Sequence, residues 1–149
     1  MAVGPRVSAL VRSERVRRAL RLWSPVAAAM AVLLYASVGS LQPDTLTEGP
    51  EAVFHLPNAD KLLHVLAYGV FTAFVFRGLR GGTSLGLRAV CLVAVGWASA
   101  YGLLLEVVQH FVGRTFSLYD ALSNAVGAAL AAGVWLLLIR RRRARFRSA

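Results

Sequence analysis

Cysteine and acidic residues are scarce in this chain. Cys91 is its only cysteine, so no disulfide framework can form within one molecule. Seven acidic residues stand against 17 basic ones, and charged residues make up only 16% of the sequence. Hydrophobic residues make up 57%, which is too apolar for an ordinary soluble domain and leaves room for one compact unit among the 149 residues.

The basic residues are confined to blocks between long apolar runs. A net charge of +10 would by itself also suit a nucleic-acid-binding protein, but a bilayer explains both the charge blocks and the apolar runs. Four runs, each close to the ~20 residues that cross a hydrocarbon core, cover 23–41, 60–79, 87–111 and 119–139. They are continuously apolar and not alternating, so we expect helices and not barrel strands.

The arginines predict the orientation of these helices. Six precede the first run, three lie where the second run ends and the third begins, and six follow the fourth, which places 15 of the 17 basic residues on one side. By the positive-inside rule that side is the cytoplasm. We therefore predict an all-α polytopic four-helix transmembrane bundle at 23–139, with basic cytoplasmic tails at 1–22 and 140–149.

The first run has one alternative interpretation, a cleavable signal peptide. Its basic lead-in and the small residues of 36–40 suit that interpretation. Its apolar part is longer than a typical signal core, however. Cleavage would also leave an odd number of spans, with the C-terminal arginines still requiring a cytoplasmic location. We therefore expect the first helix to be retained.

Polar side chains gather at the predicted outer ends of the other three helices. Ionisable residues are costly at membrane depth, so their convergence predicts a site near the outer leaflet. Helical spacing puts the members from each helix on one face, and Ser117 with Asp120 forms a capping-box pattern. The predicted site residues are Asp60, Lys61, His64, Tyr68, Glu106, Gln109, Arg114, Asp120 and Asn124.

Small residues accompany these polar faces. Gly96 and Gly102 lie on the same broad face as Glu106, and Gly127 continues the stripe of Asp120 and Asn124. Small residues at such spacings let helix backbones approach closely. We expect all three glycines to pack against neighbouring helices.

The residue types leave several uses of the polar cluster open. One use is a structural ion-pair network that pins the helix ends. A second is binding of an anionic headgroup or phosphate by Lys61 and Arg114. A third is acid–base catalysis, for which the candidates are His64, Asp60, Glu106 and Asp120.

A metal site is the remaining alternative. Asp60 with His64 and Glu106 with His110 are two carboxylate-x3-His pairs, a spacing that puts both ligands on one helix face. The pairs match no known zinc signature. We therefore expect neither a metal nor a cofactor.

The order and spacing of the polar residues resemble the VanZ-like family, small bacterial membrane proteins named after a teicoplanin-resistance accessory protein. The resemblance rests on Asp60-Lys-x-x-His-x-x-x-Tyr68, Glu106-x-x-Gln109, Gly113-Arg114 and Asp120-x-x-x-Asn124 followed by Gly127. It implies a multi-pass protein of the bacterial plasma (inner) membrane. It also implies a role at the outer face, where lipid-linked cell-wall intermediates and the antibiotic meet.

We therefore expect an outer-leaflet polar pocket that binds a cell-envelope or lipid headgroup. The expected partners are membrane lipids and a lipid-linked cell-wall intermediate or anionic headgroup, with no nucleic acid. We expect this binding to be linked to glycopeptide (teicoplanin) resistance or to envelope maintenance. The alternatives are an intramembrane enzyme acting on a lipid-linked envelope substrate, and a structural protein whose charges only pin the bundle. A transporter is disfavoured because no charge lies near mid-membrane.

Overall fold

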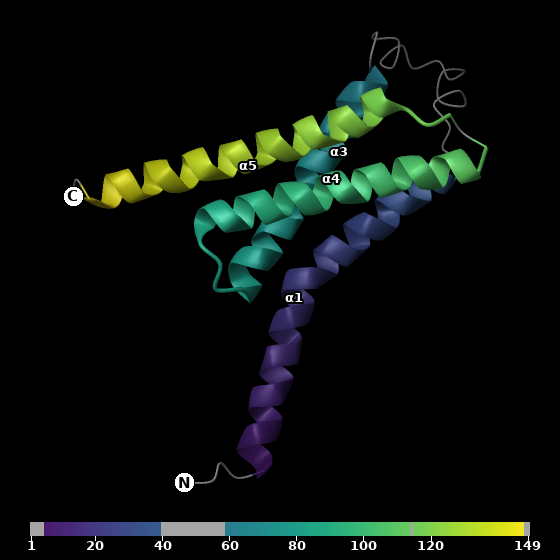
Figure 1. Ribbon diagram of the computed structural model, residues 1–149. Coiled ribbons are helices and arrows are strands. Elements are labelled where there is room, and N and C mark those ends of the chain that lie inside the picture. Colours follow the sequence, from purple (N-terminus) through teal and green to yellow (C-terminus); the bar gives the residue numbers. More distant parts are fainter. Residues whose placement is uncertain (1–4, 40–58, 114, 148–149) are drawn as a thin grey trace, which may run out of the picture.

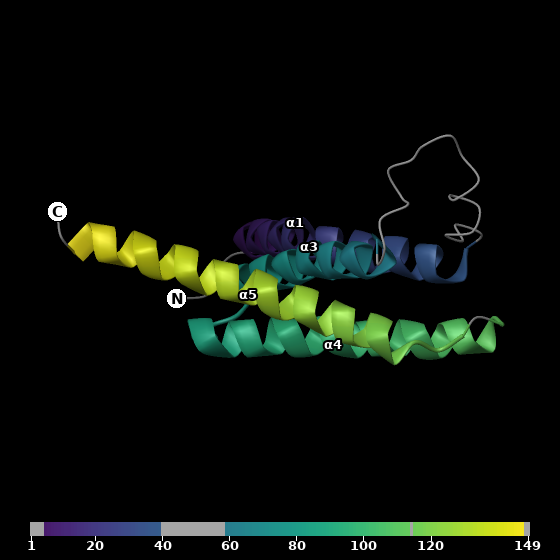
Figure 2. The ribbon, with the colours of Figure 1, turned by 90° about the horizontal axis from the view of Figure 1, so that it is seen from above.

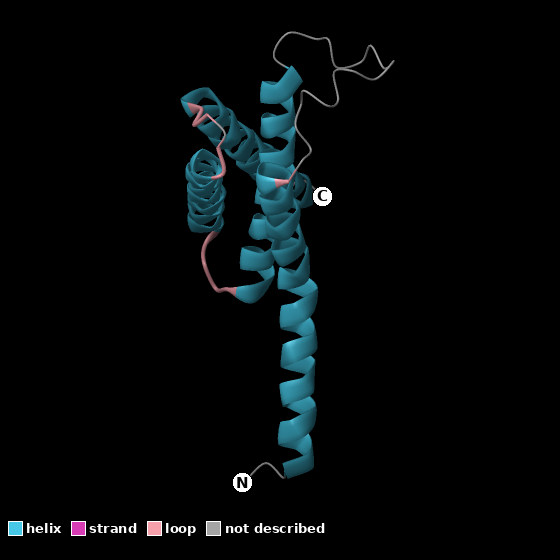
Figure 3. Ribbon diagram, turned by 90° about the vertical axis from the view of Figure 1, so that its right-hand side faces the viewer, coloured by secondary structure: helices cyan, strands magenta, loops and turns pink. Residues whose placement is uncertain are grey.

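The computed structural model describes residues 5–39, 59–113 and 115–147, and these form four helices (Figure 1). The described residues contain no strand (Figure 3). All four helices are long and apolar enough to cross a membrane, which confirms the predicted all-α multi-pass membrane protein. They are α1 (Pro5–Val38), α3 (Ala59–Gly82), α4 (Leu87–Phe111) and α5 (Leu118–Arg147).

Two helices continue into the basic segments that flank the bundle. α1 begins at Pro5, well before residue 23, and α5 runs on to Arg147, past residue 139. Arginine is a good helix former, and proline at a first helical position meets no backbone conflict. The side of the membrane on which these ends lie stays a prediction.

α1 changes direction part-way along its length (Figure 1), and Pro25 is its internal proline. A proline inside a helix has no N–H to donate, so the carbonyl of Arg21 loses its usual partner. The guanidinium of Arg77 in α3 donates to that carbonyl over 3.2 Å. A hydrogen bond between helices therefore replaces one that proline removed within α1.

α3 is the central helix of the bundle, since it packs against α1, α4 and α5. From above, α5 runs obliquely across the other helices (Figure 2). The core between them is formed by side chains that are almost completely buried, including Phe71, Val75, Val90, Ala94 and Ala128. Tyr101 of α4 fastens α1 to this core, because its hydroxyl donates to the Met30 carbonyl over 2.6 Å.

Glycine brings α3 and α5 into backbone contact. A methyl group on Gly127 would overlap with the backbone carbonyl of Val65, so only glycine fits this crossing. The expectation of close packing is confirmed at Gly127. It is wrong at Gly96, where an added methyl would meet nothing within 4 Å, because that position lies on the outer surface of α4.

Candidate functional site

The start of α3, the end of α4 and the start of α5 meet at one end of the bundle (Figure 1). Two polar contacts join α3 to α5 there. Nδ1 of His64 lies 2.9 Å from Oδ1 of Asn124, and Nζ of Lys61 lies 3.1 Å from Oδ1 of Asp120. The members of each helix are about one turn apart, so the two contacts are stacked along the α3–α5 crossing.

The hydrogen bond to Asn124 defines the tautomer of His64. A carboxamide oxygen only accepts, so Nδ1 of His64 carries the hydrogen and donates to Asn124. In the neutral ring, Nε2 is then an acceptor. Asn124 is only 1% exposed and His64 is half-buried, so this hydrogen bond is partly shielded from solvent.

Lys61 joins two carboxylates. Its ammonium forms ion pairs with the adjacent Asp60 and with Asp120 of α5. The side chains of Lys61, Asp60 and Asp120 are respectively 35%, 45% and 20% exposed, so the network is partly open to solvent. Ion pairs of this exposure hold geometry more than they add stability.

Glu106 supports the start of α5 from α4. Its Oε2 accepts a hydrogen bond from the backbone N–H of Ser117 over 3.3 Å. Oγ of Ser117 in turn accepts from the backbone N–H of Asp120 over 3.2 Å, which is one half of the predicted capping box. Glu106 takes the place of Asp120 as acceptor for the Ser117 N–H. Glu106 is 1% exposed, and a buried carboxylate requires such donors. This link between Glu106 and Ser117 was not predicted, because no sequence spacing indicates it.

Gly102 makes room for the site. A methyl group there would come within 2.9 Å of both Asn124 Nδ2 and Tyr68 Cε1. Gly102 therefore allows the side chains of α3 and α5 to meet against α4, as the small-residue pattern predicts. Tyr68 is buried, and its ring makes an edge contact with Phe71 in the core.

A cavity of about 210 Å³ opens beside this cluster, between α1, α3 and α4. Its polar lining comes mainly from α3 and α4, whereas α1 contributes Leu33, Ala36 and Ser37. Five of the predicted site residues line it: Asp60, His64, Tyr68, Glu106 and Gln109.

The other predicted residues have different positions. Lys61, Asp120 and Asn124 are absent from the cavity lining. Lys61 contacts Asp60 of the lining, Asn124 contacts His64 of the lining, and Asp120 contacts Lys61. Arg114 lies outside the described residues. The lining thus carries two carboxylates and one histidine, and the ammonium of Lys61 is engaged by Asp60 and Asp120.

The same cluster includes a set of metal-ligand types. His64, Glu106 and Asp120 each offer one ligand atom, and these atoms lie within 4.8 Å of one another. The set differs from the two pairs suggested by sequence spacing, because His110 is exposed and outside this group. An ion here would have to displace Lys61 from Asp120 and compete with the Ser117 amide for Glu106.

Comparison with known proteins bears on the identity of this bundle. Neither curated proteins nor solved structures gave a match. A family model described as VanZ/LLP1 matches residues 10–140, a range that includes three of the four candidate membrane spans in full, most of the fourth, and every residue of the cluster. The chain belongs to the VanZ/LLP1 family.

Proposed function

We propose that this protein binds the polar headgroup of a cell-envelope or membrane lipid in the cavity between α1, α3 and α4. One observation carries the proposal: the cavity has polar residues on α3 and α4 and apolar residues beside them, at one end of a membrane-spanning bundle. A lipid has the same division, since its headgroup is polar and its remainder is not.

The size of the cavity limits what enters it. Sites for drug-sized molecules are about 300–1,000 Å³, whereas this cavity measures about 210 Å³. It therefore suits a headgroup and not a whole lipid. The apolar part of the ligand would lie along Leu63 and Leu105 and continue into the bilayer.

The lining defines the chemistry of the bound group. Carboxylates accept hydrogen bonds, so Asp60 and Glu106 favour hydroxyl, amide or ammonium groups of the ligand. Gln109 both donates and accepts, and it would orient the same headgroup. Lys61 would set the positions of the two aspartates, since its ammonium contacts both. Contact with anionic oxygens stays the predicted role of Arg114.

We place this activity in the bacterial plasma membrane and link it to envelope maintenance, including the response to teicoplanin. The family resemblance supports that location and phenotype. Cells with and without the protein should then differ in teicoplanin susceptibility, and equal susceptibility would remove this part of the proposal.

Photocrosslinking in native membranes tests the binding site. A diazirine amino acid at Leu63, which lines the cavity, is compared with one at Leu130 of α5, which does not. The two side chains are 51% and 59% exposed, so they are matched in access. Leu63 should capture one headgroup class in excess, whereas Leu130 should capture the average lipid mixture. The same mixture at both positions would refute the proposal.

A second candidate is an intramembrane enzyme that acts on a lipid-linked envelope substrate. The closeness of His64, Glu106 and Asp120 favours it, because an imidazole beside carboxylates is suited to proton transfer. Purified protein would then turn over substrate, and His64→Gln would abolish product formation. Binding that survives His64→Gln, with no product formed by the unsubstituted protein, would leave binding as the function.

A further inference from the structure

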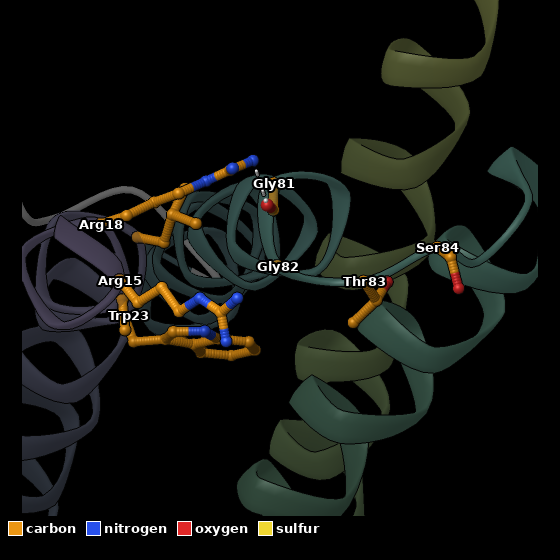
Figure 4. A pocket seen from close by; sticks show the side chains of 9 residues that line it. Arg15, Arg18, Trp23, Gly81, Gly82, Thr83 and Ser84 are labelled. Atoms are coloured by element: carbon orange, nitrogen blue, oxygen red, sulfur yellow. Dashed lines mark hydrogen bonds between the residues drawn. The ribbon is translucent and has the colours of Figure 1, made fainter. Parts of the chain in front are cut away.

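A larger cavity of about 480 Å³ lies at the opposite end of the bundle, where α1 meets the end of α3 and the loop before α4 (Figure 4). Arg15, Arg18 and Trp23 of α1 contribute to one wall. Gly82, Thr83 and Ser84 contribute to the other. None of these residues belongs to the cluster described above.

The walls of this second cavity are held in place by contacts between α1 and α3. One guanidinium nitrogen of Arg18 donates to the Gly81 carbonyl over 3.0 Å. The ring of Trp23 lies against glycines, since a methyl group on Gly78 would be 3.3 Å from it. The hydroxyl of Thr83 donates to the Leu79 carbonyl over 2.7 Å and fixes the start of the loop.

Hydrogen-bond donors remain available in the cavity. Arg15 extends from α1 on the same side as Trp23 (Figure 4), and within the described part of the chain its guanidinium has no hydrogen bond or ion pair. Arg18 commits one donor to Gly81, and a guanidinium has five. The Ser84 hydroxyl also has no partner among residues 5–39, 59–113 and 115–147.

The charge of the lining selects an anion. Arg15 and Arg18 are three residues apart and so share a helix face, and no acidic residue is among the described residues that line the cavity. Guanidinium groups match phosphate oxygens with paired hydrogen bonds. Tryptophan and arginine at the end of a membrane helix lie at headgroup depth, and basic pockets between helix ends bind anionic headgroups.

We propose that this cavity binds a phosphate group, with Arg15 and Arg18 as its cationic ligands and Ser84 as an additional donor. The phosphate of an anionic phospholipid is the source that membrane depth favours, and free phosphate is the other source. The site would fasten the arginine-rich part of α1 to the α3–α4 loop through the ligand. It is independent of the headgroup site at the other end.

The test compares two variants that each remove one positive charge from α1. Arg15→Gln alters the cavity, whereas Arg17→Gln alters an exposed arginine outside it. Neither side chain has a hydrogen bond or ion pair among the described residues, so both variants should fold. Binding to the purified protein is titrated with phosphatidylglycerol, phosphatidylcholine and inorganic phosphate, and read by native mass spectrometry.

We expect Arg15→Gln to weaken phosphatidylglycerol binding about tenfold, the effect of losing a hydrogen bond to a charged group. Arg17→Gln should change it far less, and Ser84→Ala should lower it by a smaller factor than Arg15→Gln. Binding of phosphatidylglycerol but not free phosphate identifies a lipid site, and binding of both identifies a general phosphate site. The proposal would be overturned by equal losses of phosphatidylglycerol binding in Arg15→Gln and Arg17→Gln. It would also be overturned if neither phosphatidylglycerol nor inorganic phosphate binds.

Discussion

His64 of α3 and Asn124 of α5 meet with 2.9 Å between Nδ1 and Oδ1, although 60 positions separate them in the chain. Asn124 is almost fully buried, and Gly102 of α4 provides the space beside it. This one contact joins two helices against a third at the level of the proposed headgroup site. Loss of this contact would leave Nδ1 of the His64 ring without its hydrogen-bond acceptor.

Asn124→Ala should destabilise the bundle by about 1–3 kcal/mol, because Nδ1 of the partly buried His64 loses its acceptor. The measurement is the free energy of unfolding in mixed micelles. Ser123→Ala is the control, since Oγ of Ser123 donates to the Tyr119 carbonyl of its own helix, has no other hydrogen bond within the described part of the chain, and the position is less buried. Equal losses for the two variants would show that the contact with His64 contributes nothing.

Two glycines of α5 should respond to alanine with opposite signs. Gly127→Ala should cost about 1–3 kcal/mol, because its methyl group overlaps with the Val65 carbonyl and forces α3 away from α5. Gly133→Ala should be neutral or stabilise by up to about 1 kcal/mol, since its methyl group meets nothing within 4 Å and alanine favours helix. Thermal unfolding measures both. A stabilising Gly127→Ala would contradict the close crossing.

The ion pair between Lys61 and Asp120 should have a small coupling energy. Lys61→Met, Asp120→Asn and the double variant form a thermodynamic cycle, from which we expect about 0.5–1 kcal/mol. The value is low because the two side chains are 35% and 20% exposed. A coupling of zero would show that Lys61 does not set the position of Asp120.

Divalent metal should have little effect on this protein. The ammonium of Lys61 contacts Asp120 and the amide of Ser117 donates to Glu106, so an ion between His64, Glu106 and Asp120 would compete with both of these partners. Chelation followed by addition of zinc or manganese should therefore leave the unfolding temperature unchanged. A rise with one metal that His64→Ala removes would instead assign a metal site.

Much of the fold follows from hydropathy. Four long apolar runs predicted four helices, since lipid leaves the backbone few other solutions. Helix ends were less predictable. Continuation of α1 back to Pro5 and of α5 to Arg147 depends on helix propensity outside the bilayer, where hydropathy carries no signal.

The gathering of the candidate site residues at one end of the bundle was predictable, but the rotation of each helix about its own axis was not. Alternating topology brings the start of α3, the end of α4 and the start of α5 to one end, so Asp60, Glu106 and Asp120 converge. Which side of α3 faces which neighbour depends on packing, however. Lys61 therefore contacts α5 while Asp60 lines the cavity. Gly96 and Gly102 share a broad helix face in sequence, but only Gly102 meets a neighbouring helix.

The most direct test of the proposed headgroup site is native mass spectrometry of protein gently extracted from its own membrane. Ala67 lines the cavity, so Ala67→Phe should fill it, while Ala129→Phe adds the same ring to an exposed alanine of α5 outside it. The account predicts a co-purifying lipid or envelope precursor in the unsubstituted protein and Ala129→Phe that is lost in Ala67→Phe. The same bound species at the same occupancy in all three proteins would contradict it.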